Sequence, residues 1–221
     1  MSNGVDLERF SPGPADAGLR SRHALPPDRP VILSVGRLSR EKRADVLIAA
    51  LARLAEPVLV LAGSGPDEGR LRALARHYGV ADRVRFPGFV PDDDLPGLYR
   101  LADVFATASQ AELQSLATMA ALASGLPAVA VNAGALGELV HAGENGFLTR
   151  PGHAGEMADS VGLLCGDASL RTRMSKASLR IIADHDRHRV LARWESIYRA
   201  LAGSAACGTR GARESAEEKN R

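Results

Sequence analysis

The sequence has little of what would mark several special classes of protein. Cysteine accounts for only 2 of the 221 residues, and neither Cys165 nor Cys207 has a metal-ligand partner at a useful spacing. This scarcity excludes a disulfide-stapled scaffold. The six histidines also form no recognised metal-binding motif with a cysteine. We therefore expect no metal site.

An excess of charge of one sign and long hydrophobic runs are also missing. The 28 basic and 26 acidic residues leave a net charge of +2, which gives no electrostatic footprint for binding nucleic acid. The apolar runs at 58–62 and 128–131 are far shorter than the roughly 18 residues that span a bilayer. The opening segment has no hydrophobic stretch of the secretory type. We expect a cytoplasmic protein with at most peripheral membrane contact.

The rest of the composition, 45% hydrophobic and 24% charged, is that of an ordinary globular protein. Short apolar runs that indicate buried strands alternate with segments of helical periodicity. We expect strands at 31–35, 58–62, 84–86, 104–106, 128–131 and 147–149. We expect helices at 44–55, 71–78, 95–102 and 115–124, with three more after Pro151, the last of them at 186–201.

Strands that alternate with helices predict βαβ units and a parallel sheet that is covered on both faces. The predicted fold class is therefore α/β, with a doubly wound parallel sheet. Five prolines between Pro12 and Pro30 make residues 1–29 a lead-in or linker, and the domain itself spans 30–202. The small, polar residues of 203–221 predict a tail without fixed structure.

Ligands of doubly wound sheets bind beyond the carboxyl ends of the strands, so the loops there are the candidate sites. The loop at 36–42 lacks both the G-x-G-x-x-G and the G-K-[ST] motifs, but it places Arg37 and Lys42 just before a helix. Two cations beside a helix N-terminus would suit a diphosphate. An equally open interpretation at this point is that both are solvated loop cations.

The segment 109–117 is the second candidate. Glu112 stands just ahead of a predicted helix, where a carboxylate can accept hydrogen bonds from hydroxyl groups. The free N–H groups near Ser115 and Leu116 can hold an anion. The alternative interpretation is that Glu112 only complements the helix dipole, and this segment taken alone favours that alternative.

Taken together and in order, these segments resemble the C-terminal, donor-binding domain of the retaining GT-B glycosyltransferases of family four. The resemblance runs from Ser2 to Leu201 through the segments SNGVDLERF, SVGRLSREKRADVLIAAL, LVLAGSGPDEGRLRALA, VRFPGFVPDDDLPGLYRLADVFATAS, ELQSLATMAALASGLPAVAV and GELVHAGENGFL. It implies a Rossmann-like domain that binds a nucleotide-diphosphate sugar, uses no further cofactor and requires no metal.

The resemblance also implies residue roles. Arg37 and Lys42 would bind the donor diphosphate, and the backbone of Val90 would contact the base. Glu112 would hydrogen-bond the transferred sugar, with the amides of Ser115 and Leu116 beside it. The implied catalytic residues are Glu112, Arg37 and Lys42.

Two departures from the family pattern bear on activity. Family members carry a second glutamate eight residues after the first, where it holds the ribose hydroxyls, and this chain has Ala120 there. They also begin with an acceptor-binding N-terminal domain, and this sequence begins at the linker that follows it. We therefore expect the chain by itself to be weakly active or inactive.

Two hypotheses of function follow. The first is a glycosyltransferase that moves a sugar from a nucleotide diphosphate to an acceptor hydroxyl with retention. The second is a non-catalytic module that binds a nucleotide sugar or a partner. The predicted last helix carries an apolar stripe, consisting of Val190, Leu191, Trp194, Ile197, Tyr198 and Leu201. We expect this last-helix stripe to pack on an N-terminal domain, to self-associate or to collapse onto its own domain.

Overall fold

The computed structural model describes the backbone of residues 3–217 and the side chains of residues 3–202. Its centre is one parallel six-stranded sheet in the order β3-β2-β1-β4-β5-β6. The strands are β1 (Val31–Val35), β2 (Val58–Ala62), β3 (Val84–Gly88), β4 (Val104–Thr107), β5 (Ala128–Val131) and β6 (Gly146–Thr149). All six lie where the sequence predicts strands, and the doubly wound α/β class is confirmed.

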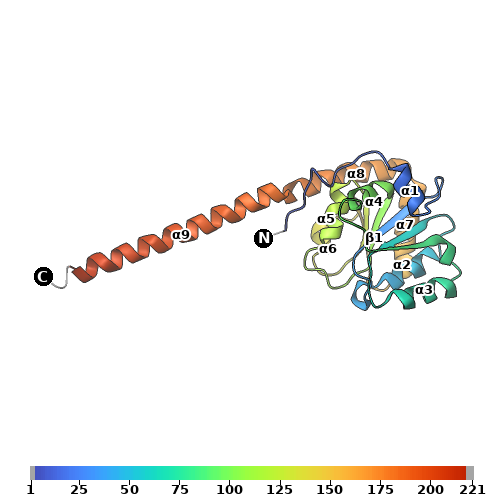
Figure 1. Cartoon of the computed structure of the whole chain (residues 1–221), viewed down its shortest axis with the longest axis horizontal. Helices are drawn as coiled ribbons and strands as arrows, with labels where there is room; N and C mark the ends of the chain where they lie inside the picture. The colour runs from blue at the N-terminus through green and yellow to red at the C-terminus, as the bar shows by residue number, and fades with distance from the viewer. Residues whose placement is uncertain (1–2, 218–221) are drawn as a thin grey trace.

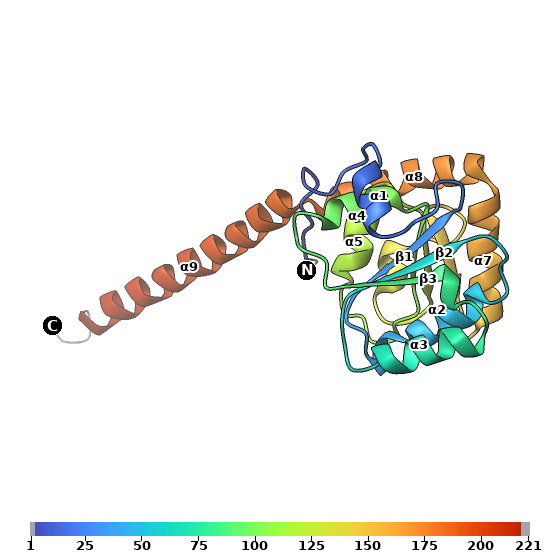
Figure 2. The same cartoon turned by 45° about the vertical axis from the view of Figure 1, so that its right-hand side comes forward.

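The inner strands of the sheet are largely apolar because the sheet is covered on both faces. Every residue of β2, β4 and β5 is buried. Figure 2 shows α2, α3 and α7 on one side of the sheet and α1, α4 and α5 on the other. The bounds of these helices are α1 (Ala17–Arg22), α2 (Ala44–Leu51), α3 (Glu68–His77), α4 (Leu95–Leu101), α5 (Leu116–Ala123) and α7 (Ala154–Gly166). The chain also contains α6 (Leu136–Leu139), α8 (Ala168–Ile182) and 3₁₀ turns at Arg40–Lys42, Ala81–Arg83 and Ala183–His185.

The strand order reverses between β1 and β4. These two neighbouring strands run side by side from Ile32 opposite Val104. The connections from β1 pass along one face of the sheet and the connections from β4 along the other, so the loops after β1 and β4 diverge. The resulting crevice lies at the carboxyl ends of the strands.

The proline-rich lead-in packs against the domain rather than running free. Its side chains Val5, Phe10, Leu19 and Leu25 are all buried. The ring of Phe10 meets Tyr99 edge-on at a centroid distance of 5.6 Å. The lead-in also contains a short helix, α1, which the prolines around it conceal in the sequence.

The last helix, α9 (Arg187–Glu217), leaves the domain as a straight rod (Figure 1). The expected collapse of the last-helix stripe onto its own domain does not occur, because Leu191 and Tyr198 are 57% and 63% exposed. The helix also continues through 203–217, for which the sequence predicts no fixed structure. That stretch contains no proline, and its alanine, arginine and glutamate residues favour a helix, whereas its three glycines disfavour one. The rest of the predicted tail, 218–221, lies outside the described residues.

Candidate functional site

The loop after β1 is held in place by backbone contacts with the loop after β2. The N–H of Gly36 donates to the carbonyl of Ala62 at 2.9 Å, and the N–H of Leu38 donates to the carbonyl of Ser64 at 3.0 Å. A Cβ at Gly63 would lie 1.9 Å from the Gly36 carbonyl oxygen. Only glycine allows the two loops to come this close, and their contact fixes where Arg37 leaves the strand.

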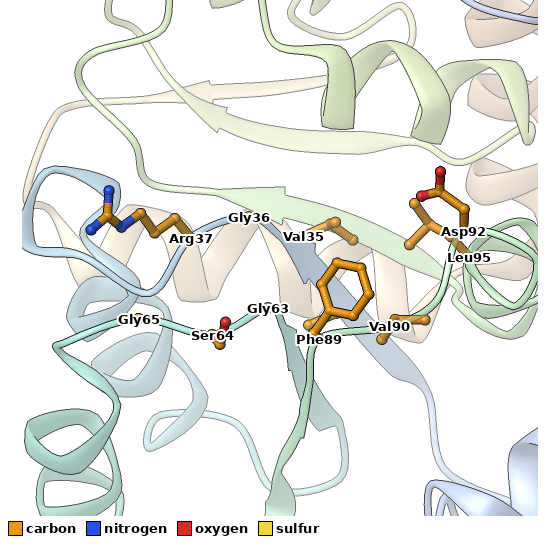
Figure 3. A pocket seen from close by; sticks show the side chains of 11 residues that line it. Val35, Gly36, Arg37, Gly63, Ser64, Gly65, Phe89, Val90, Asp92 and Leu95 are labelled. Atoms are coloured by element: carbon orange, nitrogen blue, oxygen red, sulfur yellow. The ribbon is translucent and has the colours of Figure 1, made fainter.

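Arg37 and the residues around it line a first cavity of about 540 Å³ at this end of the sheet. Figure 3 shows its side chain extending from the loop after β1, on the far side of the cavity from Phe89, Val90 and Asp92. Val90 itself is buried, so its backbone forms the wall, whereas the ring of Phe89 is 76% exposed. The cavity therefore has one cationic end and one end formed by the chain after β3.

Lys42 and Glu112, 70 residues apart in the sequence, meet in a second cavity of about 240 Å³. Lys42 Nζ lies 2.6 Å from Glu112 Oε1, and the two side chains are 31% and 13% exposed. Arg37 lines this cavity as well, together with Ser115 and Leu116. The structure thus brings together five of the six residues that the sequence predicts, and Val90 lies in the adjoining cavity.

Glu112 is positioned by the loop that follows β5. The N–H of Ala135 donates to the Glu112 carbonyl at 3.1 Å. A Cβ at Gly134, whose φ is +56°, would lie 2.4 Å from the same oxygen. The carboxylate is therefore held on the loop between β4 and α5 by a glycine that lets the neighbouring loop approach.

Ser115 is the N-cap of α5. Its Oγ accepts hydrogen bonds from the backbone N–H of Thr118 at 3.3 Å and from the Thr118 hydroxyl at 2.8 Å. The backbone N–H groups of Leu116 and Ala117 belong to the first turn, where no carbonyl of the helix accepts from them. They lie at the positive end of the helix dipole. Both residues line the second cavity, so an anion bound there would meet this helix end.

Glu41 lies between Arg37 and Lys42 in the sequence of the loop after β1. The Ser39 hydroxyl donates to Glu41 Oε1 at 2.5 Å, and this hydrogen bond is the main reason that the pKa of Glu41 is lowered. The charges of Arg37 and Lys42 lower it further. Arg37 and Lys42 therefore act on the same carboxylate, although hydrogen bonds account for most of its lowered pKa.

Several lining residues were given no role from the sequence. Phe89, Asp92, Ser64, Gln114 and Thr107 also line the two cavities. Each of them ends a strand or follows the end of β2, β3 or β4. That position is the only sequence signal by which they could have been predicted. Among the described residues, no three histidine, cysteine, aspartate or glutamate side chains form a group that could hold a metal ion. No helix within the described part is long and apolar enough to cross a membrane.

The fold and these cavities define a doubly wound α/β domain with its ligand crevice at the point where the strand order reverses. The family model described as "Glycosyl transferases group 1" matches residues 17–180. The chain belongs to this family, as the sequence resemblance predicts.

Curated relatives match about half of the chain. It is 45% identical over 108 residues to the GDP-mannose-dependent alpha-(1-6)-phosphatidylinositol monomannoside mannosyltransferase of Mycobacterium tuberculosis, covering 47% of this chain and 28% of the relative. It is 38% identical over 125 residues to D-inositol 3-phosphate glycosyltransferase 2 of Catenulispora acidiphila, covering 51% of this chain and 29% of the relative. The matched part is thus less than a third of the length of these relatives.

Solved structures match most of the chain. Sucrose-phosphate synthase from Thermosynechococcus elongatus has a TM-score of 0.84 at 28% identity, covering 91% of this chain and 52% of that one. The Anabaena protein HepE, in its complex with UDP-glucose, has a TM-score of 0.81 at 29% identity, covering 90% and 56%. The chain therefore spans about half the length of these structures.

Proposed function

We propose that this chain is the donor-binding part of a glycosyltransferase that transfers a sugar from a nucleotide diphosphate to an acceptor hydroxyl with retention. The observation that carries the proposal is the contact between Lys42 and Glu112. It places a cation suited to a diphosphate 2.6 Å from a carboxylate suited to sugar hydroxyls. Membership of the glycosyl transferases group 1 family supports it.

The geometry suggests how the donor would lie. The base would contact the backbone of Val90 in the first cavity, and the diphosphate would lie between Arg37 and Lys42. The amides of Ser115 and Leu116 would face the same phosphate oxygens or the sugar beside them. Glu112 would accept hydrogen bonds from the hydroxyls of the transferred sugar.

Chemically, these groups would act on the leaving group. When the bond between the anomeric carbon and the diphosphate breaks, negative charge grows on the phosphate oxygens. In this pose Arg37, Lys42 and the N-terminus of α5 would face the charge as it develops, which is an arrangement that stabilises a transition state. With this neutralisation the reaction would need no metal and no cofactor beyond the donor itself.

A second candidate is a module that binds a nucleotide sugar without transferring it. The observation that favours it is Ala120. Family members carry a carboxylate at this position, whereas the alanine of this chain lines a cavity beside the site. Transfer also requires an acceptor hydroxyl held about 3–3.5 Å from the anomeric carbon, and every role proposed above serves the donor.

The test separates binding from transfer. Calorimetric titration of the chain with UDP, GDP and their hexose conjugates should show binding. Glu112→Gln should lower the affinity for the sugar conjugate more than the affinity for the free diphosphate. Transfer is then assayed with the chain alone and with the added N-terminal half of a full-length relative. Transfer only in the second case supports the first candidate, and binding without transfer in either case supports the second. No binding of any nucleotide would refute both.

A further inference from the structure

A third cavity, of about 320 Å³, adjoins the two that the proposed donor would occupy. Val35, at the end of β1, lines all three cavities. Leu95 is shared by the first and third cavities, and Leu116 by the second and third. The three cavities therefore meet over the end of β1.

This meeting point corresponds to one part of a nucleotide sugar. The donor is a linear molecule in which ribose joins the base to the diphosphate. With the base at Val90 and the diphosphate at Arg37 and Lys42, the ribose must pass over Val35, where the third cavity opens. The inference rests in this respect on the proposed function.

The walls of the third cavity are almost entirely apolar. They are formed by Gly4, Val5, Phe10, Val35, Leu95, Tyr99, Leu116, Ala117 and Ala120, with Asp6 and Arg187 as the charged members. The Tyr99 hydroxyl is already used, since it donates to the Ala117 carbonyl at 3.1 Å.

The charged pair in the wall is also engaged. Asp6 Oδ1 accepts hydrogen bonds from the N–H groups of Glu8 at 3.2 Å and Arg9 at 3.0 Å. Asp6 Oδ2 lies 3.2 Å from Arg187 Nη1. The acceptor capacity of this carboxylate is therefore directed at its own loop and at the first residue of α9, and not at a sugar in the crevice.

Ala120 is the position that decides the character of this wall. It lies on α5, one helical turn after Leu116, and is 5% exposed, and it still borders the cavity. A long side chain at this position would lean back toward the N-terminus of α5, which is the direction of the crevice. Alanine places a methyl group there instead, so a ribose hydroxyl at this wall meets hydrocarbon.

We propose that Ala120 makes the donor site of this chain indifferent to the ribose 2′-hydroxyl, so that it takes 2′-deoxyribonucleoside diphosphates as readily as ribonucleoside diphosphates. A site that hydrogen-bonds a substrate hydroxyl rejects the analogue without it, because a buried polar group is then left unpaired. An apolar wall has no such group to leave unpaired. The donor class thus includes sugars carried on deoxyribonucleotides.

The first test needs no variant. The full chain is titrated calorimetrically with UDP and 2′-dUDP, and with GDP and 2′-dGDP, so that the result does not depend on the preferred base. We expect the deoxy and ribo dissociation constants to agree within about threefold, because no hydrogen bond distinguishes them. Binding of the ribonucleotide that is tighter by about tenfold or more would overturn the proposal. If neither series binds, the proposed function fails and this inference fails with it.

The second test restores a carboxylate. Ala120→Glu should tighten ribonucleotide binding by about tenfold or more and deoxyribonucleotide binding much less, because the deoxyribose offers the carboxylate fewer hydroxyls. Ala120→Gln has a similar length without the charge and should give a smaller gain. Ala73→Glu, on the exposed face of α3, adds the same charge away from the crevice and should change neither constant. An Ala120→Glu variant that melts earlier with an unchanged deoxy-to-ribo ratio would show that position 120 does not face the ribose.

Discussion

Replacing Arg37 with alanine tests the anion site with little interference from folding. The side chain is exposed and lines both donor cavities, and it forms no ion pair among the described residues. Removal of a solvated surface cation changes the free energy of unfolding by no more than about 0.5 kcal/mol. The melting temperature of the variant should therefore stay close to that of the parent chain.

Its effect on ligand binding should be much larger. A hydrogen bond between charged groups contributes about 1.5–3 kcal/mol, which corresponds to an affinity loss of about 10- to 150-fold. The loss should shrink at high salt, because mobile ions screen an exposed cation. Titration calorimetry with UDP and GDP at low and high ionic strength measures both effects.

Arg40→Ala is the matched control. Arg40 is an exposed arginine three residues further along the same loop, and it lines neither donor cavity. Its removal changes the net charge by the same amount, so it reports the general field of the loop. Equal losses in the two variants, or no loss in Arg37→Ala, would return Arg37 to the status of a solvated loop cation.

Lys42→Ala should behave differently from Arg37→Ala. Lys42 is the partner of Glu112, whose side chain is only 13% exposed. Its removal leaves that carboxylate in the cavity without its cation, which destabilises the fold as well as the diphosphate site. We expect both the affinity and the melting temperature to fall. A variant that loses affinity without any loss of stability would mean that the ion pair does not position Glu112.

Three further predictions concern other parts of the molecule. Asp67 is buried and accepts from Arg70 at 2.8 and 2.6 Å, which holds its pKa below the usual 3.8. The pair therefore stabilises the fold above about pH 4 and stops doing so as the pH falls through the lowered pKa. Thermal unfolding of Asp67→Asn should show a deficit of about 1 kcal/mol at pH 7 that vanishes at low pH, and a deficit that persists there would contradict this. Burial raises the pKa of Cys165 to about 12. In a Cys207→Ser chain, its thiol should react with a disulfide reagent at pH 8 on the order of 10³-fold more slowly than free cysteine, and a rate like that of free cysteine would show that the site opens. The exposed last-helix stripe should drive self-association that Trp194→Glu abolishes in sedimentation velocity, and a parent chain that stays monomeric at every concentration would refute it.

The sheet could be predicted from the sequence because burial on both faces leaves a simple pattern. Runs such as 58–62 contain no polar residue, and their ends coincide with the observed strand ends. The predicted positions of the helix ends were less accurate. The predicted helix 44–55 ends at Leu51, because Arg53 N–H and Leu54 N–H turn to carbonyls three residues back and tighten the chain before β2.

The lead-in shows what a periodic pattern cannot reveal. Val5, Phe10 and Leu19 are buried but follow no helical or strand period. Helix α1 is nucleated by Asp16, whose carboxylate accepts from two backbone N–H groups at its start, and six residues contribute one buried leucine. A segment rich in proline gives no local sign of such a helix. The burial of its side chains depends on surfaces formed by residues far away in the sequence, so no local pattern predicts it.

The candidate site was predicted as a set of loops and not as a set of contacts. Loops after strands could be read from the sequence, but the meeting of Lys42 with Glu112 depends on the order of strands β1 and β4. A strand order with the two further apart would have given the same local signals. The contact between Lys42 and Glu112 is a property of the fold, and the sequence determines it only by determining the strand order.

The residues that shape the crevice most are those with the smallest side chains. This explains why only part of the site could be predicted from the sequence. Gly63 and Gly134 matter because a Cβ at either position would meet the backbone of the loop beside it. Ala120 matters because a methyl group leaves the third cavity apolar. In the sequence each has an ordinary explanation, either as a turn residue or as a good helix former. A missing side chain becomes informative only once the space that it leaves has a shape and neighbours, and here that space adjoins the two cavities proposed for the donor.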